Sequence, residues 1–238
     1  MKIHRFIGNF DFDKKITSIT NKEIYNQIKN VLRLKSGEQI ILGDGKGREA
    51  HAEIMDFGKQ RVGINILKVE VNGAEPEMKP ILYAAILKKE NFELVAEKAV
   101  EAGVAEIIPV ITAKTIKTNL RMDRLEKIVR EAAEQSGRGI LPVVGKILKF
   151  SEALRHAEGN DSNLFFEIHA PRFEQRKLAA DFGKKVGIWI GPEGGWDEEE
   201  EIKVAQEKNF QIVSLGKLTL RAETAAIIAS YLVASAKN

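Results

Sequence analysis

The chain has 238 residues, of which 44% are hydrophobic and 30% charged, and its formal net charge at pH 7 is +3. These values fit a soluble globular protein of one large or two smaller domains, and the absence of cysteine excludes disulfides, cysteine metal ligands and a thiol nucleophile. The first residues, MKIHRFIGNF, have no long apolar core, and no apolar run is long enough to span a bilayer, so we expect a cytoplasmic protein with no membrane contact.

The charges are unevenly distributed along the chain. Lys and Arg exceed Asp and Glu in residues 1–150, whereas the acids are in excess in residues 151–238. A basic first part suits a polyanionic partner and leaves a different task to the rest. The four histidines have no metal-ligand spacing, so we predict no metal site.

Residues 1–73 read as a small β-rich domain. The segments Glu49–Phe57 and Arg61–Val71 alternate apolar and polar residues, as half-buried strands do. Gln39–Leu42 leads into GDGKG, which lacks the Ser or Thr and the strand-to-helix setting of a phosphate-binding loop and predicts a hairpin turn. Asn21–Leu34 has helical spacing. Several strands with one helix in so short a segment indicate a β-barrel.

The segment Asn72–Pro80, NGAEPEMKP, has the composition of a linker. After it, apolar runs that predict strands alternate with helical faces. The strands are expected at Ile81–Leu87, Ile107–Ile111, Val143–Ile147 and Leu164–Ile168, and helices are expected to end near Gly103 and Gly137 and to span Arg172–Phe182. This alternation predicts an α/β domain with a mostly parallel sheet over residues 74–238.

Two further strands, Val186–Ile190 and Ile212–Leu215, each end in a glycine-bearing turn: GPEGG after the first and Gly216 after the second. Ligands of open parallel sheets bind beyond the carboxyl ends of the strands, so the two turns are expected to line one pocket. The alternative is that the glycines only permit tight backbone turns.

The helix after the first turn opens with acidic residues. Asp197 is a good N-cap, and Glu200 three residues later completes the pattern of a capping box. The acids of this turn neutralise the positive helix end that a phosphate would need. A ligand of this pocket should therefore be neutral or cationic.

The last predicted helix, Ala222–Ala236, is apolar nearly all round. Such a helix must be buried, either within its own subunit or against another one.

Several segments resemble one family. IGPEGGW (190–196) and LGKLTLRAETA (215–225) resemble the paired signature of the RsmE-type ribosomal RNA uridine-N3 methyltransferases, which belong to the SPOUT class of enzymes dependent on S-adenosyl-L-methionine (SAM). HRF (4–6), VLRLKSGE (31–38), LKKENFELVAEKAVEAGVAEIIPV (87–110) and EAAEQSGR (131–138) are similar to further motifs of the same family.

The resemblance implies a PUA-like β-barrel over residues 1–73 and an α/β SPOUT domain with a C-terminal trefoil knot over residues 74–238. It implies a homodimer that methylates N3 of a uridine in 16S ribosomal RNA, free or in the small ribosomal subunit, with SAM as cofactor and no metal. The SAM site would consist of Ile190, Gly191, Pro192, Glu193, Gly194, Gly195, Leu215, Gly216, Leu218, Leu220, Thr224 and Ala225.

Methylation at uridine N3 has a clear chemical demand. This nitrogen carries a proton, so the enzyme must help to remove it or stabilise the resulting anion. Glu193 and Glu223 are candidate bases, and Arg138 and Arg221 are candidate anion stabilisers. RNA contacts are expected from Arg5, Arg33, Lys88, Lys89 and Arg138.

Two alternative functions stay open from the sequence. A ribose 2′-O-methyltransferase of the same class would share the knot, although its usual Asn and Ser motifs are not evident here. A non-catalytic RNA-binding protein would keep the barrel and lose SAM binding.

Overall fold

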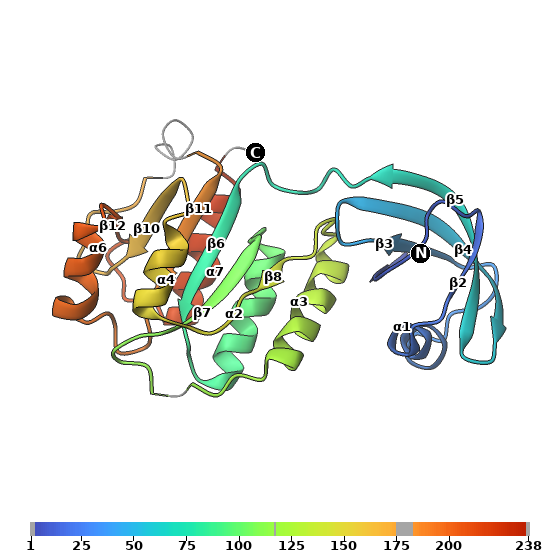
Figure 1. Ribbon diagram of the computed structural model, residues 1–238, viewed down its shortest axis with the longest axis horizontal. Coiled ribbons are helices and arrows are strands. Elements are labelled where there is room, and N and C mark those ends of the chain that lie inside the picture. The colour runs from blue at the N-terminus through green and yellow to red at the C-terminus, as the bar shows by residue number, and fades with distance from the viewer. Residues whose placement is uncertain (1–2, 117, 175–182, 237–238) are drawn as a thin grey trace. The chain divides into compact units, whose positions relative to one another are not determined.

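The computed structural model describes residues 3–116, 118–174 and 183–236 (Figure 1). Its internal contacts divide the chain into two compact units. Unit 1 consists of Met1–Glu75 and Ala133–Leu141, and unit 2 of Pro76–Ala132 and Pro142–Asn238. The second segment of unit 1 differs from the sequence expectation, which placed the whole barrel within residues 1–73.

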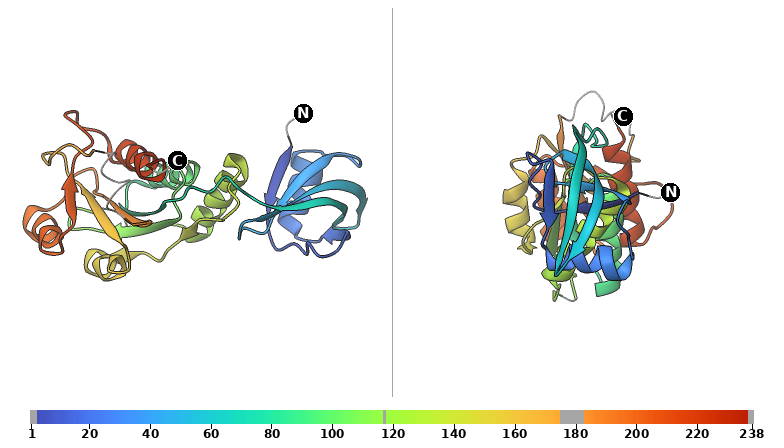
Figure 2. Two further views of the ribbon diagram at one scale, coloured as in Figure 1. Left: turned by 90° about the horizontal axis from the view of Figure 1, so that it is seen from above. Right: turned by 90° about the vertical axis from the view of Figure 1, so that its right-hand side faces the viewer.

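Unit 1 is built on a five-stranded sheet that curls around its own core (Figure 2). The strands lie in the order β1 (His4–Ile7), β3 (Gln39–Gly43), β4 (Arg48–Gly58), β5 (Arg61–Val71) and β2 (Ile16–Ile19). The β1–β3 pairing is parallel and the others are antiparallel. Two register shifts between β4 and β5 are the kind of irregularity that bends a strand and increases its twist.

The predicted hairpin turn of GDGKG is confirmed between the antiparallel strands β3 and β4. The Asp44 carboxylate accepts the backbone N–H of Lys46 at 2.7 Å, and Gly45 and Gly47 have φ angles of +69° and +104°, which glycine adopts without strain.

The predicted helix of unit 1 is shorter than its apolar spacing suggested. α1 (Lys22–Asn26) starts where the Asn21 side chain accepts the N–H groups of Glu23 and Ile24, and it continues as the π-helical turn η1 (Gln27–Val31). Arg33 then has a φ of +55°, which ends the helical segment before Leu34.

Unit 2 contains a seven-stranded sheet whose described strands all pair in parallel, as the strand–helix alternation predicted. The order is β12 (Gln211–Val213), β10 (Ser162–Phe166), β11 (Lys185–Ile190), β6 (Lys79–Ala85), β7 (Glu106–Ile111) and β8 (Val143–Val144), with β9 (Leu148–Lys149) also on β7. The strand expected at Val143–Ile147 is therefore reduced to the two residues of β8, and β9 begins just beyond its expected end.

Helices cover both faces of this sheet (Figures 1 and 2). On one face α7 (Ala222–Ala234) packs on β6, β11 and α2 (Lys89–Glu101). On the other face α4 (Phe150–Ala157), which the sequence analysis missed, and α6 (Lys203–Glu207) cover an aromatic core in which Tyr83 stacks on Trp189 with ring centroids 4.3 Å apart. α3 (Met122–Ser136) follows β7, and the helix predicted at Arg172–Phe182 lies largely outside the described residues.

The apolar helix α7 is buried within its own unit on one side only. Ala226, Ala229 and Val233 are at most 1% exposed, whereas Ile228 and Tyr231 are 38% and 61% exposed. Among the described residues, no helix has both the length and the apolar character needed to cross a membrane.

Unit 1 is closed by a polar cluster that joins its two chain segments. The Glu75 carboxylate accepts hydrogen bonds from the Arg138 guanidinium at 2.8 Å and from the backbone N–H groups of Gly139 and Ile140 at 2.9 and 3.0 Å. Asn72 donates to the carbonyl of Gly137 at 3.1 Å. The first half of the predicted linker is therefore fixed in unit 1.

The pKa of Glu75 reflects this cluster. Burial raises it, but the Arg138 guanidinium and the two backbone N–H groups outweigh burial, so the pKa lies below the ordinary value of 4.5. A carboxyl group whose pKa is lowered by folding stabilises the protein above its unfolded pKa, and that stabilisation is lost as the pH falls through the folded pKa.

Glu75→Gln should therefore lower the free energy of unfolding at pH 7 by about 3 kcal/mol, because the buried Arg138 loses its counter-charge. The difference from the wild type should shrink as the pH falls below 4.5. Urea denaturation followed by circular dichroism at several pH values measures both effects. Glu77→Gln, at an exposed position, is the matched control, and an equal loss in that variant would contradict the prediction.

Candidate active site

A cavity of about 760 Å³ lies in unit 2 beyond the carboxyl ends of β10, β11 and β6. Three segments supply most of its wall, and they follow β10, β11 and β12. The two turns that the sequence singled out therefore line one cavity, as expected for a parallel sheet. Lys88 and Asn91 complete the wall from the start of α2.

Most of the predicted cofactor residues line this cavity. They are Ile190, Gly191, Pro192, Glu193, Gly194, Gly195, Leu215, Gly216, Leu218, Leu220 and Ala225, and Thr224 is not among the lining residues. The wall formed by Phe166, Glu167 and Ile168 was not predicted from the sequence. A strand was predicted there, but local patterns do not show that it lies beside β11.

The first turn is shaped by its glycines and by Trp196. Gly195 has a φ of +70° and donates its N–H to the Pro192 carbonyl at 2.9 Å. The Trp196 indole is 7% exposed and donates to the Phe166 carbonyl at 2.9 Å. A Cβ on Gly191 would lie 3.0–3.1 Å from the indole ring, so glycine at this position lets the ring pack beneath the turn.

The helix after this turn starts directly after Asp197, as predicted, but its capping pattern differs from the predicted one. Residues Glu198–Ile202 form a π-helical turn, η2, in which Ile202 donates to the Asp197 carbonyl at 3.1 Å. The carboxylate that accepts the Asp197 N–H, at 2.8 Å, is that of Glu201. Because a π-helical turn is wider than an α-helical one, the carboxylate that accepts the Asp197 N–H comes one residue later than the predicted Glu200. The Glu200 side chain lies outside the described part of the structure.

Charged side chains lie around the cavity. The Arg221 side chain is 86% exposed, and its Nη1 lies 3.9 Å from Oε1 of Glu223, whose side chain is 11% exposed. The exposed Glu193 accepts a long contact of 3.5 Å from the Lys88 backbone N–H. Glu167 adds a third carboxylate to the lining. Three acids against Lys88 and Arg221 suit a cationic ligand better than a phosphate.

The arginines of unit 1 that were predicted to contact RNA differ in exposure and in their ion pairs. The Arg138 side chain is 6% exposed and paired with Glu75, and that of Arg5 is 14% exposed and paired with Glu49. Neither is an exposed group free to bind RNA or reacting atoms, because each is held by a carboxylate within unit 1. Arg33 is exposed, as is Lys88 in unit 2, and the Lys89 side chain lies outside the described part of the structure.

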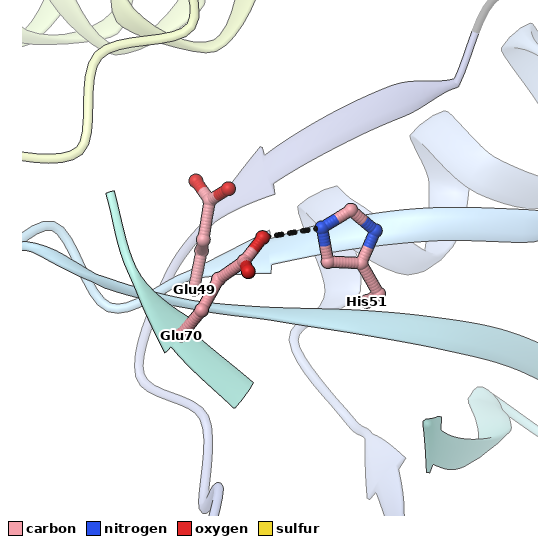
Figure 3. A group of neighbouring side chains, drawn as sticks. All are labelled: Glu49, His51 and Glu70. Carbon is pink, nitrogen blue, oxygen red and sulfur yellow. Dashed lines mark hydrogen bonds and ion pairs between the residues drawn. The ribbon is translucent and has the colours of Figure 1, made fainter. Parts of the chain in front are cut away.

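The fold brings together a group of possible metal ligands that spacing did not reveal. Ligand atoms of Glu49, His51 and Glu70 lie within 4.8 Å of one another (Figure 3). Glu49 already accepts from Arg5 and, at 2.7 Å, from Asn72. Lys68 first and then His51 hold the pKa of Glu70 below its usual range. The carboxylates are thus neutralised by protein donors, and we assign no metal to them.

Comparisons with known proteins cover both units. The family model of the RNA methyltransferase domain matches residues 74–234, and that of the RNA methyltransferase PUA domain matches residues 19–67. The ribosomal RNA small subunit methyltransferase E of Rickettsia conorii is 32% identical over 206 residues, which are 85% of this chain and 82% of the relative. The protein of the same name from Bacillus subtilis is 29% identical over 224 residues, covering 89% and 87%.

Two solved structures with bound SAM are also similar to this chain over nearly its whole length. The crystal structure of a ribosomal RNA small subunit methyltransferase E from Neisseria gonorrhoeae, bound to S-adenosyl methionine, has a TM-score of 0.87 and 32% identity, covering 96% of this chain and 95% of that one. Lpg2936 from Legionella pneumophila, in complex with the cofactor SAM, has a TM-score of 0.87 and 28% identity, covering 98% and 97%.

The packing beneath the first turn generates a prediction. Gly191→Ala should lower the free energy of unfolding by about 1–3 kcal/mol, because the added methyl group crowds the buried Trp196 ring. Thermal unfolding and tryptophan fluorescence measure the loss and the displacement of the ring. In the control Gly194→Ala the new Cβ would lie 3.5 Å from the nearest atom, an ordinary contact with Lys114, and equal effects of the two substitutions would contradict the packing argument.

Proposed function

The chain belongs to the RNA methyltransferase family, and from this premise we propose that it transfers the methyl group of SAM to N3 of a uridine in 16S ribosomal RNA. The resemblance inferred from the two signature segments is thereby confirmed at the level of the family. The substrate is the RNA of the small ribosomal subunit, and a cytoplasmic location follows from that proposed substrate.

One observation carries the assignment of SAM to the cavity. The GPEGGW turn follows β11 and the loop 215–225 follows β12, and both form the wall of one cavity. The fold of the chain matches SAM-bound relatives with a TM-score of 0.87. Backbone groups of the glycine-bearing turns can approach a ligand closely. The surplus of carboxylates suits the sulfonium charge of SAM.

The reaction forms two bonds, from N3 to the methyl carbon and from a base to the N3 proton, and breaks two. N3 of uridine attacks the methyl carbon of SAM, the bond between sulfur and the methyl carbon breaks, and S-adenosylhomocysteine leaves with the electron pair of that bond. The N3 proton must pass to a base. Glu193 and Glu223 are the candidate bases that line the cavity.

Arg221 is the candidate group that stabilises the N3 anion. Its exposure and its long ion pair with Glu223 leave the guanidinium able to meet a uracil oxygen at the cavity. We do not assign this role to Arg138, because its side chain is buried and paired with Glu75. RNA contacts are assigned to the exposed Arg33 of unit 1 and Lys88 of unit 2.

We propose that unit 2 contains the trefoil knot of the SPOUT class. Ser214, directly after the edge strand β12, exchanges backbone hydrogen bonds of 2.8 Å with Pro171 and Phe173, which follow β10. The chain then returns to α7, which packs on β6 and β11. The two hydrogen bonds and this return of the chain support a knot, which would depart from the usual rule for protein chains.

We also propose that α7 contributes to a homodimer. Its small residues face its own sheet, but Ile228 and Tyr231 project an apolar surface outward, and Leu218 on the neighbouring loop is 80% exposed. Leu218 and Ile228 also line a second hollow of about 620 Å³. Exposed apolar side chains that gather in this way mark contact surfaces.

The function is tested with purified protein, SAM and ribosomal RNA of the small subunit. Isothermal titration should give saturable SAM binding, and mass spectrometry of the digested RNA should detect N3-methyluridine. A 2′-O-methyl product would assign the ribose reaction instead, and an absence of SAM binding would leave a non-catalytic RNA-binding protein.

In the same assay Arg221→Lys should lower the single-turnover rate about 100-fold, because lysine keeps the charge but loses the planar fork of donors. The affinities for SAM and RNA should be preserved. Weaker SAM binding and a lower melting temperature, with an unchanged rate at saturation, would instead assign Arg221 to the structure of the loop.

The dimer is tested by Tyr231→Glu. A buried unpaired charge at the contact should weaken the dimer at least about 30-fold, as measured by sedimentation equilibrium. Val143→Glu is the matched control, since Val143 is 56% exposed on the far edge strand β8. A wild-type protein that is monomeric at micromolar concentration would refute the dimer.

A further inference from the structure

A buried carboxylate lies behind the cofactor turn and is not part of the cavity wall. Glu201 is 1% exposed. Its Oε1 accepts the backbone N–H of Ala113 at 2.9 Å, and its Oε2 accepts that of Asp197 at 2.8 Å. Both partners are donors, so the arrangement suits an ionised carboxylate, which offers only acceptors.

A second contact joins the same two segments, this time through a side chain of the segment after β7. Lys114 Nζ donates to the carbonyl of Trp196 at 2.8 Å. The segment Thr112–Thr115, directly after β7, is thus bonded twice to the residues that follow the GPEGG turn. Trp196 is held from a third side by its bond to Phe166.

The two central glycines of the turn have no side chains that could pack against neighbouring residues. A Cβ placed on Gly195 would meet no protein atom within 4 Å, and one on Gly194 would meet only Lys114. Glycine-rich backbone has many accessible conformations, so the binding conformation of the turn depends on what anchors its end. Besides the bond from Trp196 to Phe166, the end of the turn is anchored by the Glu201 carboxylate and the Lys114 ammonium.

We infer that Glu201 is a positioning residue for methyl transfer: it holds the turn 191–197 in the conformation that binds SAM and joins it to the segment after β7. The inference rests on the proposed function, because the cavity must be the SAM site. Glu201 touches neither the cofactor nor the reacting atoms and acts through the backbone N–H groups of Asp197 and Ala113.

Glu201→Gln tests this role with little change in volume. The amide has one acceptor oxygen and one donor nitrogen, so one of the two backbone N–H groups would face another donor. We expect the Kd for SAM to rise about tenfold or more, as for the loss of a buried charged hydrogen bond. The kcat at saturating SAM and RNA should stay within about twofold.

Two further variants keep the test decisive. Lys114→Met removes the second anchor at an exposed position outside the cavity wall, and we expect it to fold and to raise the Kd for SAM about threefold or more. Glu207→Gln, an exposed carboxylate of α6, should leave the Kd unchanged.

Wild-type SAM affinity in Glu201→Gln, with only a lower melting temperature, would overturn the inference. If that variant does not fold, wild-type affinity in Lys114→Met would overturn it. Failure of the wild-type protein to bind SAM would refute the proposed function itself, so the two failures are distinguishable.

Discussion

The cavity depends on the parallel pairing of β10 with both β11 and β12. In that register Phe166 lies opposite Ile190 on one side and opposite Val213 on the other, so the three strands reach the same edge of the sheet together. The three turns that follow must then open at the same place. Segments that begin about 25 residues apart in sequence therefore become walls of one cavity.

Local patterns in the sequence predicted the strands, their parallel arrangement and the two glycine-bearing turns. They did not predict the third wall at Phe166–Ile168, because the neighbours of a strand are set by the whole sheet. The pairing that buries Arg138 could not be predicted for a related reason: its partner Glu75 lies 63 residues away in sequence. The shift from Glu200 to Glu201 arose because the helix begins with a π-helical turn, which changes the spacing that a capping box assumes.

Four carboxylates in unit 1 and near the cavity differ in how many hydrogen bonds they accept from the protein. Glu75 and Glu201 are fully engaged by N–H donors of the protein, and such carboxylates fix backbone rather than react. Glu193 and Glu223 line the cavity with only long contacts of 3.5 and 3.9 Å. These are the carboxylates left available to a substrate. The sequence alone does not distinguish carboxylates that are bound by protein N–H groups from carboxylates that face the cavity.

The construction of unit 1 from Met1–Glu75 and Ala133–Leu141 affects how the protein is made. During translation the first 75 residues emerge long before Arg138 and the backbone donors at 139 and 140, which neutralise Glu75. Glu75 of the nascent barrel therefore stays solvated while β6, α2, β7 and most of α3 are synthesised. Domains usually fold in order from the amino terminus, but here the last step of the first domain is coupled to the synthesis of the second.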